Sequence, residues 1–233
     1  IENVIYLVST PIGSIADFTL KALDLLTRVD VLIAEDKRVL RRLMSMHKVP
    51  LNKRTIYLYN DHSANFNRTQ IVSELKSGKS VAYFSDAGTP LISDPGFKLV
   101  DRVISEGFEV KVAPGASSVL AAICLSGLPT DRFLFNGFVP TKKTARNNFL
   151  LELKNLPFTL IFLESPKRLV CTLDNMATIF GDERFGVICR EITKLHEEIT
   201  RNRLNVLRDF YANKTSVKGE IVIVIEGFKK EGV

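Results

Sequence analysis

A polar loop, SDAGTPLISDPG at Ser85–Gly96, groups residues whose chemistry suits ligand binding. It contains two Asp, two Gly and two Pro, together with three Ser or Thr hydroxyls. Glycine permits close backbone approach and left-handed dihedral angles, whereas proline fixes the path of the chain. The simpler alternative is a tight turn between a strand and a helix, but the loop is longer and more polar than such a turn requires. We therefore interpret Ser85–Gly96 as a preformed ligand cradle.

Three polar loops of this kind each follow a short apolar run that is typical of a buried strand, and helical patterns separate them. The loops lie at Thr10–Ser14, Ser85–Gly96 and Pro114–Ser118. Either Ser117 or Ser118 can cap the helix that continues through Leu125. In an open α/β sheet, ligands bind at the carboxyl ends of parallel strands, so we expect the three loops to converge at one edge.

Four consecutive charged residues, Glu35–Arg38, follow the strand pattern Val31–Ala34. They mark either the solvated start of a helix, where acidic residues suit the positive end of the dipole, or the rim of a site. The helix pattern that follows carries Arg38 and Arg41, a basic face that either tracks a phosphate backbone or is simply solvated. A loop histidine, His62, is likewise either catalytic or structural.

Two nucleotide-binding motifs are excluded. Gly78-Lys79-Ser80 resembles the end of a P-loop, but Ser73 stands where the first glycine of that motif belongs, and a strand pattern follows instead of a helix. No GxGxxG sequence follows the first strand pattern, which argues against a dinucleotide dehydrogenase.

Composition describes a folded protein, and the basic net charge suggests a polyanionic partner, although many basic proteins bind none. Of 233 residues, 45% are apolar and 25% are charged, and no apolar run is long enough to span a bilayer. Three cysteines, Cys124, Cys171 and Cys189, lie far apart in apolar segments, which indicates reduced core residues and a cytoplasmic location. The net charge of +6 suits nucleic acid. The chain starts at Ile1 and not at Met, which leaves room for a short leader segment before it.

Past Ser126–Pro129, the alternation of strand and helix patterns changes to longer strand patterns with basic loops. We place a domain boundary there, within 113–130, and expect an N-terminal domain at 1–116 and a C-terminal domain at 117–233. A basic, flexible loop is predicted at Pro140–Arg146, where it either contacts RNA phosphates or is solvated. Mixed-charge segments follow the later strand patterns at Glu164–Arg168, Arg190–Glu198 and Lys218-Gly219.

Seven segments carry a family resemblance. They are LVSTPIG at Leu7–Gly13, AED-R at Ala34–Arg38, SDAGTPLISDPG at Ser85–Gly96, PG-S at Pro114–Ser117, SGLPTDRF at Ser126–Phe133, ESP-R at Glu164–Arg168 and RE-TKLHEE at Arg190–Glu198. Together they resemble the ribosomal RNA small subunit methyltransferase I family of the tetrapyrrole methylase superfamily. The resemblance runs in order from Ile5 to Gly227, and SDAGTPLISDPG with TKLHEE is its most specific part.

This resemblance implies a two-domain α/β fold, with a mostly parallel N-terminal sheet flanked by helices, a mixed C-terminal domain, and the cofactor in the inter-domain cleft. It implies S-adenosylmethionine-dependent 2′-O-methylation of a cytidine in the decoding centre of 16S ribosomal RNA within the small ribosomal subunit. Relatives form homodimers, and no membrane partner is implied. By strand-end equivalence, cofactor contacts are expected at Thr10, Pro11, Asp86, Ala87, Gly88, Thr89, Pro90, Leu91, Ser117, Ser118, Leu163, Cys189 and Gly219. RNA contacts are expected at Arg38, Arg41, Lys142, Lys143, Arg146, Arg168 and Lys194.

Methyl transfer from a sulfonium is an in-line displacement, so it requires alignment and no metal. A ribose hydroxyl is a poor nucleophile while protonated, and a general base or a cation that stabilises the alkoxide should assist it. The candidate bases are Glu35, Asp86, Asp94, Glu191 and His196, and the candidate cations are Arg38, Arg190 and Lys194. The sequence does not choose among them, because each is equally explained by an ion pair or a loop-fixing hydrogen bond.

Five positions depart from the family pattern, namely Ser14, Lys37, Asn60, Ser63 and Lys167. They lie on the expected RNA rim, so they bear on the choice of target more than on cofactor binding. Two other functions therefore stay open: a methyltransferase that acts on a small tetrapyrrole, and a non-catalytic RNA-binding or ribosome-assembly factor that keeps the fold. The basic loop and the LPTDRF and TKLHEE segments argue against the first.

Overall fold

The computed structural model describes residues 3–60 and 64–229. The chain divides into two compact units, an N-terminal unit at Ile1–Ser117 and a C-terminal unit at Ser118–Val233. This division falls beside the predicted boundary between residues 116 and 117.

Over the described residues, the N-terminal unit is built on a five-stranded sheet with the order β3-β2-β4-β1-β5. Its strands are β1 (Val4–Val8), β2 (Val31–Ala34), β3 (Thr55–Leu58), β4 (Val81–Phe84) and β5 (Glu109–Ala113). All neighbouring strands are parallel, so the loops that follow them leave from one edge. The predicted parallel sheet is confirmed.

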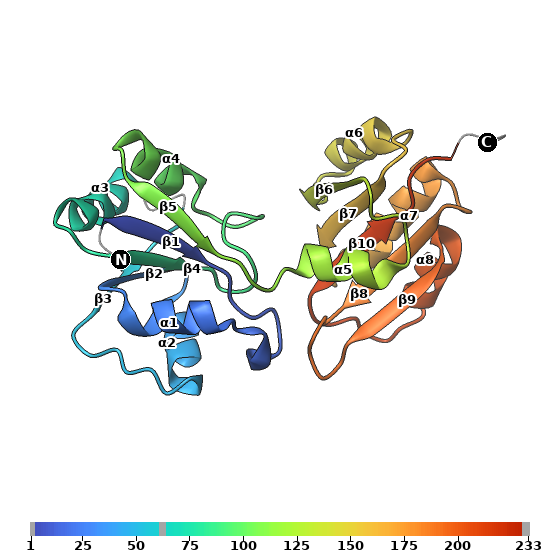
Figure 1. The fold of residues 1–233 in the computed structure, drawn as a ribbon. Coiled ribbons are helices and arrows are strands. Elements are labelled where there is room, and N and C mark those ends of the chain that lie inside the picture. Colours follow the sequence, from blue (N-terminus) through green and yellow to red (C-terminus); the bar gives the residue numbers. More distant parts are fainter. Residues whose placement is uncertain (1–2, 61–63, 230–233) are drawn as a thin grey trace. The chain divides into compact units, whose positions relative to one another are not determined.

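Helices cover both faces of this sheet (Figure 1). They are α1 (Leu20–Arg28), α2 (Lys37–Met46), α3 (Ala64–Lys76) and α4 (Phe97–Ser105), with a short 3-10 turn, η1, at Ile15–Asp17. Leu32 and Ala82 pack on the side of α1 and α2, whereas Ile33 and Tyr83 pack on the side of α3 and α4. Because both faces are covered, the central strands are apolar along their whole length.

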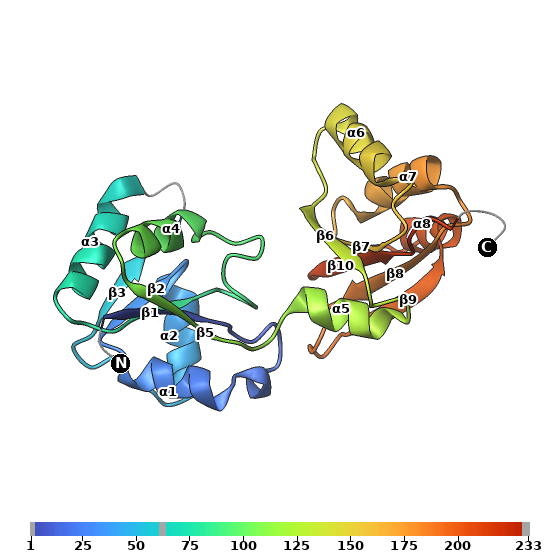
Figure 2. The same ribbon diagram turned by 45° about the horizontal axis from the view of Figure 1, so that its top comes forward.

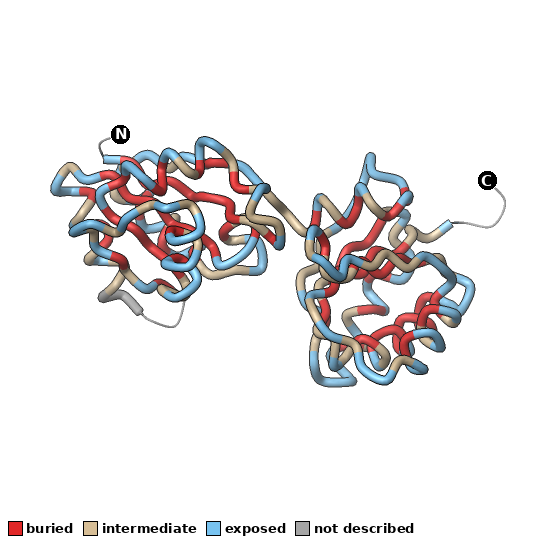
Figure 3. Tube along the Cα trace, turned by 90° about the horizontal axis from the view of Figure 1, so that it is seen from below, coloured by how far each residue is buried: buried red, intermediate tan, exposed pale blue. Residues whose placement is uncertain are grey.

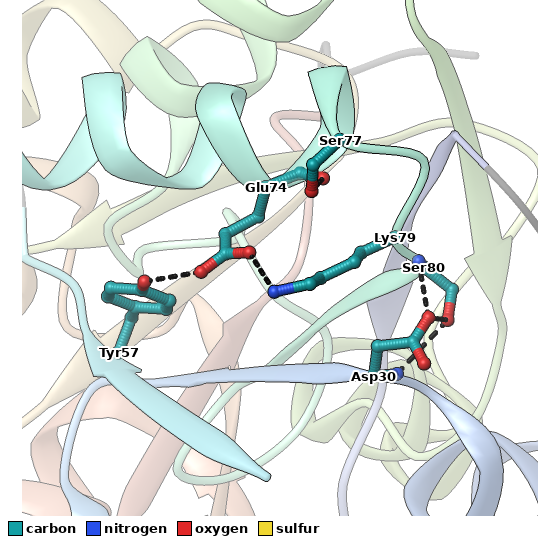
Figure 4. A network of polar contacts seen from close by, with 6 residues as sticks. All are labelled: Asp30, Tyr57, Glu74, Ser77, Lys79 and Ser80. Carbon is teal, nitrogen blue, oxygen red and sulfur yellow. Dashed lines mark hydrogen bonds and ion pairs between the residues drawn. The ribbon is translucent and has the colours of Figure 1, made fainter.

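Polar contacts hold the sheet at the ends where its strands begin (Figure 4). Asp30, just before β2, accepts hydrogen bonds from the backbone N–H and the hydroxyl of Ser80, just before β4, at 2.8 and 2.7 Å. Glu74 of α3 accepts from the Tyr57 hydroxyl and from the Lys79 ammonium, both at 2.6 Å. The hydrogen bond to Glu74 raises the pKa of Tyr57 to about 12. These contacts form a structural base on the side away from the predicted site.

The C-terminal unit contains a mixed sheet whose order, over the described residues, is β6-β7-β10-β8-β9. Its strands are β6 (Phe133–Phe138), β7 (Thr159–Glu164), β8 (Phe185–Arg190), β9 (Glu198–Arg203) and β10 (Ile221–Ile225). β6 and β7 are parallel, and the other neighbours are antiparallel. The helices are α5 (Ser118–Ser126), α6 (Lys143–Leu153), α7 (Leu169–Phe180) and α8 (Leu204–Ala212).

In this unit α5 covers one face of the sheet, and α6, α7 and α8 cover the other (Figure 2). Phe162 and Ile188 pack with the three later helices. Cys189 faces α5, and its thiol lies 3.9 Å from the carbonyl oxygen of Ala122. The buried positions, red in Figure 3, follow the strands of each unit.

The prediction of longer strands and basic loops in the second half is partly wrong, because it missed α6, α7, α8 and β9. Most of α7 is buried, so no wide polar face marks its helical period. The sequence of β9, EITRNR, is polar because this edge strand is half-exposed or exposed along its length. None of the described helices combines the length and the apolar character that a membrane span requires.

Candidate functional site

The loops after β1 and β4 are joined by a two-way backbone bridge. The N–H of Thr10 donates to the carbonyl oxygen of Gly88 at 2.9 Å, and the N–H of Gly88 donates to that of Thr10 at 3.1 Å. The Thr10 hydroxyl donates to the Ser85 carbonyl oxygen at 3.1 Å, and the Ser85 hydroxyl donates to that of Gly88 at 2.6 Å. Thr10 is only 3% exposed, so its polar groups hold the loops together.

The loop after β5 is tied to the same place. The Ser9 hydroxyl lies 3.3 Å from the Thr89 hydroxyl, which in turn donates to the carbonyl oxygen of Ala116 at 3.2 Å. Gly115 packs closely against the loop after β1, because a Cβ there would lie 3.0 Å from the Cβ of Ser9 and would require a small shift. The predicted convergence of three loops is therefore confirmed within the N-terminal unit. We call the segments Thr10–Ser14, Ser85–Gly96 and Pro114–Ser117 the loop cluster.

Left-handed backbone shapes the central loop of this cluster. Gly88 has a φ of +83°, and Leu91 and Ser93 have φ values of +72° and +63°. The left-handed conformation costs a non-glycine residue about 1 kcal/mol or more of conformational free energy, so such a residue is found where neighbouring contacts restrain the backbone. The Tyr83 hydroxyl supplies one such restraint, since it donates to the carbonyl oxygen of Pro95 at 2.8 Å. The loop is therefore preformed.

Three carboxyl groups crowd the same edge: Glu35 after β2, Asp86 after β4, and Asp94 in the central loop. Burial, and then repulsion from Asp94 and Asp86, raises the pKa of Glu35 to about 7. Burial and repulsion from Asp86 raise the pKa of Asp94 to about 6. Burial also raises the pKa of Asp86, although the N–H of Asp36 donates to it at 3.1 Å. One oxygen of Glu35 is buried without a hydrogen-bond partner among the described residues.

The charged run Glu35–Arg38 is both a helix start and a site rim. Asp36 caps α2 by accepting the N–H of Arg38 at 2.7 Å, and it also pairs with the Arg38 guanidinium at 2.6 Å. These bonds lower the pKa of Asp36 to about 2. The Arg38 side chain is 90% exposed, and Arg41 is exposed on the same helix. The predicted basic face of α2 is thus open to solvent.

In the C-terminal unit, strand register gathers predicted residues at one end of the sheet. Ile221 begins β10 and lies between Glu164, which ends β7, and Arg190, which ends β8. Leu163 and Cys189 lie one row inward, on either side of the same strand. We call this end of the sheet, with the turn at 191–197 that follows β8, the C-terminal edge.

Glu191 and Lys194 fix the start of that turn. The Glu191 carboxylate accepts from the Lys194 ammonium at 2.9 Å and from the N–H of Glu220 at 2.8 Å. Burial opposes its ionisation, but these hydrogen bonds lower the pKa of Glu191. The Glu191 side chain occupies the place that a Cβ on Gly219 would need, so that position requires glycine. Glu191 is therefore engaged as a structural acceptor.

Other predicted cofactor and base residues differ widely in access. The Cys189 side chain is fully buried, and burial raises the pKa of its thiol to about 12. Leu163 is half-buried, and His196 is exposed in the turn after β8. Ser118 is the first residue of α5. Cys189 is a core residue, as predicted, whereas Cys124 and Cys171 are exposed, so the prediction of core cysteines is wrong for those two.

The predicted basic loop is wrong from Lys143 on, because α6 begins there. Lys142 and Lys143 are exposed, as an RNA contact requires. Arg146, in contrast, is only 5% exposed and donates to Asn175 at 2.5 Å and to the Cys171 sulfur at 3.2 Å. The helical period turns Arg146 toward α7, which removes the reason for assigning it to RNA.

Glu164 and Arg168 form a buried anchor at the C-terminal edge. The Glu164 side chain is fully buried and pairs with Arg168 at 2.5 Å. It also accepts from the Thr172 hydroxyl and from the N–H of Ser165, both at 2.6 Å. One guanidinium nitrogen of Arg168 is buried without a hydrogen-bond partner among the described residues. The sequence indicated a mixed-charge segment at Glu164–Arg168 but not this buried ion pair.

Sequence reasoning did not predict that the Ser9 and Ser85 hydroxyls hold the loop cluster together. Their one signal is position, since each directly follows a buried strand. His62 and Ser63 lie outside the described residues. Among the residues that the structure does describe, no set of three or more His, Cys, Asp or Glu side chains is arranged to hold a metal ion.

The chain matches the family model of the Tetrapyrrole (Corrin/Porphyrin) Methylases over residues 4–207. Two relatives bear the name ribosomal RNA small subunit methyltransferase I. The one from Mesorhizobium japonicum is 45% identical over 225 residues, which cover 97% of this chain and 76% of the relative. The one from Rickettsia prowazekii is 41% identical, and the match covers 97% of this chain and 79% of the relative.

A solved structure supports the fold. The uroporphyrin-III C-methyltransferase of Thermus thermophilus, complexed with S-adenyl homocysteine, matches with a TM-score of 0.63 and 21% identity. The match covers 95% of this chain and 96% of that chain. At this identity, the likeness shows that the two proteins share their fold.

Proposed function

The chain belongs to the ribosomal RNA small subunit methyltransferase I family of the tetrapyrrole methylases, and from this premise we propose that it methylates the 2′-oxygen of one cytidine in the decoding centre of 16S ribosomal RNA. It is a methyltransferase that uses S-adenosylmethionine. The observation that carries the proposal is the loop cluster, where three hydrogen-bonded loops meet three carboxyl groups that form no ion pair with a described Lys or Arg.

The residues of the loop cluster fit S-adenosylmethionine. This cofactor carries a sulfonium and an ammonium group, which carboxylate and carbonyl oxygens complement. No described Lys or Arg forms an ion pair with Glu35, Asp86 or Asp94, and only Asp86 has a favourable charge nearby, that of Arg38, so these carboxyl groups can accept a cationic ligand. When bound, the cofactor supplies an electrophilic methyl group.

Different residues of the cluster have different proposed roles. Those that contact the cofactor are Pro11, Asp86, Ala87, Gly88, Thr89, Pro90, Leu91 and Ser117. Thr10 positions the loops, because its backbone and hydroxyl bond to Gly88 and Ser85. Ser118, Leu163, Cys189 and Gly219 remain proposed contacts that rest on the family resemblance.

Glu35 is the proposed general base. Its pKa of about 7 suits proton transfer near neutral pH, because a base works best when its pKa is close to the operating pH. One oxygen of its carboxyl has no hydrogen-bond partner among the described residues, so no protein donor competes for that oxygen. The 2′-hydroxyl would transfer its proton to Glu35 as the ribose oxygen forms its bond to the methyl carbon, while the bond between that carbon and the sulfonium sulfur breaks and S-adenosylhomocysteine leaves as a neutral thioether. Glu191 is less suitable, since Lys194 and Glu220 occupy its carboxylate.

The substrate proposed here is the small ribosomal subunit. The exposed side chains of Arg38, Arg41, Lys142 and Lys143 provide positive charge for the phosphate backbone. Arg168 and Lys194 are secondary candidates, because each is already bound to a carboxylate. A homodimer in the cytoplasm is proposed on the strength of the family resemblance.

The test is transfer of tritium from labelled S-adenosylmethionine to small subunits from cells that lack this gene, with nuclease mapping of the label. We expect label on one decoding-centre cytidine ribose, and a decline of activity with salt that is steeper than the decline of cofactor affinity. Cofactor binding without label would contradict the proposal. It would favour the small-tetrapyrrole enzyme or the non-catalytic assembly factor.

The role of Glu35 is tested with Glu35→Gln, which keeps the shape of the side chain and removes its charge. We expect kcat to fall by about 10²-fold or more, since positioned bases contribute about 10² to 10⁴. The control is Asp24→Asn, an exposed carboxylate on α1. Retention of wild-type kcat by Glu35→Gln would exclude Glu35 as the base and leave the methyl-transfer proposal standing.

A further inference from the structure

Leu195 lies at the tip of the turn after β8, where hydrogen bonds and ion pairs of the turn keep its side chain exposed to solvent. Its side chain is 93% exposed, the highest value among the large hydrophobic residues of the described chain. Isolated exposed apolar residues are common and need no explanation by themselves. The case for Leu195 therefore rests on the construction of the turn that carries it.

Several side-chain hydrogen bonds and ion pairs fix the backbone conformation of that turn. Glu191 and Thr193 have φ values of +54° and +63°, a region that costs each about 1 kcal/mol or more. The Lys194 ammonium bridges the carboxylates of Glu191 and Glu220, at 2.9 Å to each. The N–H of Thr193 donates to the Glu197 carboxylate at 2.6 Å. These bonds on both sides of Leu195 keep the tip from folding back.

A leucine that could collapse onto the protein surface would gain about 2 kcal/mol by doing so. The clamp formed by Glu191, Lys194 and Glu220 prevents that collapse and presents the side chain outward. A side chain held in this way favours the binding of a partner, because its conformational entropy is lost when the protein folds and not when the partner binds.

We propose that Leu195 and its exposed neighbour His196 form a contact platform for an unstacked base of single-stranded RNA. Base faces are bound by apolar and planar side chains, and sequence-specific RNA recognition targets splayed single strands. Lys194 is paired with two carboxylates, so it attracts phosphate less strongly than an unpaired lysine would. Lys218, beside Gly219, is exposed and forms no ion pair with a described residue, which suits the adjoining phosphate. This inference rests on the proposed RNA substrate and adds a specificity-determining contact to it.

The first experiment measures methylation kinetics on small ribosomal subunits. Leu195→Ala should raise the KM for subunits about tenfold, because a base contact contributes about 1–3 kcal/mol. The kcat, the affinity for S-adenosylmethionine and the Tm should stay at wild-type values. Leu151→Ala, an exposed leucine on α6 in the same unit, is the matched control. A KM for Leu195→Ala within twofold of the control would overturn the proposal, whereas failure of the wild type to methylate would overturn the proposed function.

A second experiment uses the absence of tryptophan from this sequence. L195W places a single indole at the tip, and stacking on a base should quench its fluorescence when small subunits are added. L151W should show no comparable quenching. Sedimentation of Leu195→Asp identifies the rival partner: if this variant is monomeric while the wild type is dimeric, the tip binds a second copy of the chain and the RNA assignment is wrong.

The rigidity of the turn is tested with Lys194→Met, which removes the bridging charge and leaves Leu195 in place. We expect its KM for subunits to rise while its affinity for S-adenosylmethionine is kept. An unchanged KM, together with an increased KM for Leu195→Ala, would overturn the part of the proposal that assigns preorganisation to the clamp.

Discussion

The loop cluster and the C-terminal edge both concentrate acidic side chains, but their surroundings have opposite effects. In the loop cluster, burial and mutual repulsion raise the pKa of Glu35 to about 7 and that of Asp94 to about 6. At the C-terminal edge, burial also opposes ionisation, but Lys194 bonds to Glu191 and Lys214 to Glu198, and the pKa of each carboxyl is lowered. One region therefore keeps negative charge uncompensated, and the other uses compensated charge to fix backbone.

This difference indicates that the carboxyl groups of the loop cluster serve ligand binding, whereas those of the C-terminal edge stabilise the local structure. Uncompensated carboxylates destabilise the free protein and become favourable when a cationic ligand arrives. Compensated carboxylates add rigidity and leave little to a ligand.

Removal of the most buried paired carboxylate should have the largest effect on stability. Glu164→Ala leaves Arg168, the Thr172 hydroxyl and the N–H of Ser165 without their acceptor. We expect the free energy of unfolding, from urea denaturation of the full chain, to fall by about 3 kcal/mol. Glu183→Ala, which removes an exposed partner of Arg203, should cost less than about 1 kcal/mol. Equal losses of unfolding free energy in the two variants would show that the buried ion pair of Glu164 stabilises the fold no more than an exposed one.

Substitutions at Gly88 and Gly107 distinguish the effect of backbone strain on stability from an effect on cofactor binding. Gly88→Ala and Gly107→Ala place a side chain at nearly equal φ values, +83° and +82°. Both should lose about 1 kcal/mol of stability. Only Gly88→Ala should lose affinity for S-adenosylmethionine, by about tenfold in calorimetric titration, because its Cβ would also press on Ile12 at 3.4 Å. A similar affinity loss in Gly107→Ala would show that strain alone, at any position, weakens binding.

Lys214→Met tests compensation at the C-terminal edge. Lys214 donates to both oxygens of Glu198 at 2.8 and 2.7 Å, and its ammonium also lies 4.6 Å from the centre of the Phe210 ring; methionine removes the ammonium and keeps a side chain of similar length. At neutral pH the variant should be less stable by about 1 kcal/mol. A lowered carboxyl pKa stabilises above the unfolded pKa, and this contribution is lost as pH falls through the folded pKa. The difference in Tm should therefore disappear in acid; persistence below about pH 3 would assign it to packing.

Glu35→Gln should show the opposite pH dependence and the smallest effect on stability. Because the folded pKa of Glu35 is raised to about 7, the wild type loses stability as pH rises between about 4.5 and 7, whereas glutamine does not titrate. The full linkage for such a shift is about 3 kcal/mol, and water at this half-exposed carboxyl reduces it to about 1 kcal/mol. Tm measured across this pH range should favour the variant increasingly toward alkaline pH. A constant difference would contradict the raised pKa, and Asp101→Asn on α4 is the control.

Much of the loop cluster could be predicted from sequence because its signals are local. The apolar runs before Thr10, Ser85 and Pro114 indicated buried strands, and the Gly and Pro residues that follow marked loops. Parallel pairing then required the loops to meet. Helices of the C-terminal unit were harder to predict, since α7 is buried on most sides and α6 begins within a basic segment.

The sequence by itself determined the family, the parallel sheet of the N-terminal unit and the meeting of its loops, because short-range patterns specify strands and turns. Only the tertiary structure decided which acids are available. Glu35 and Glu191 both follow strands and look alike in sequence, yet one faces Asp86 and Asp94 and the other faces Lys194 and the N–H of Glu220. Ionisation depends on distances between residues remote in the chain, and burial, as for Arg146, depends on which face of an element is covered.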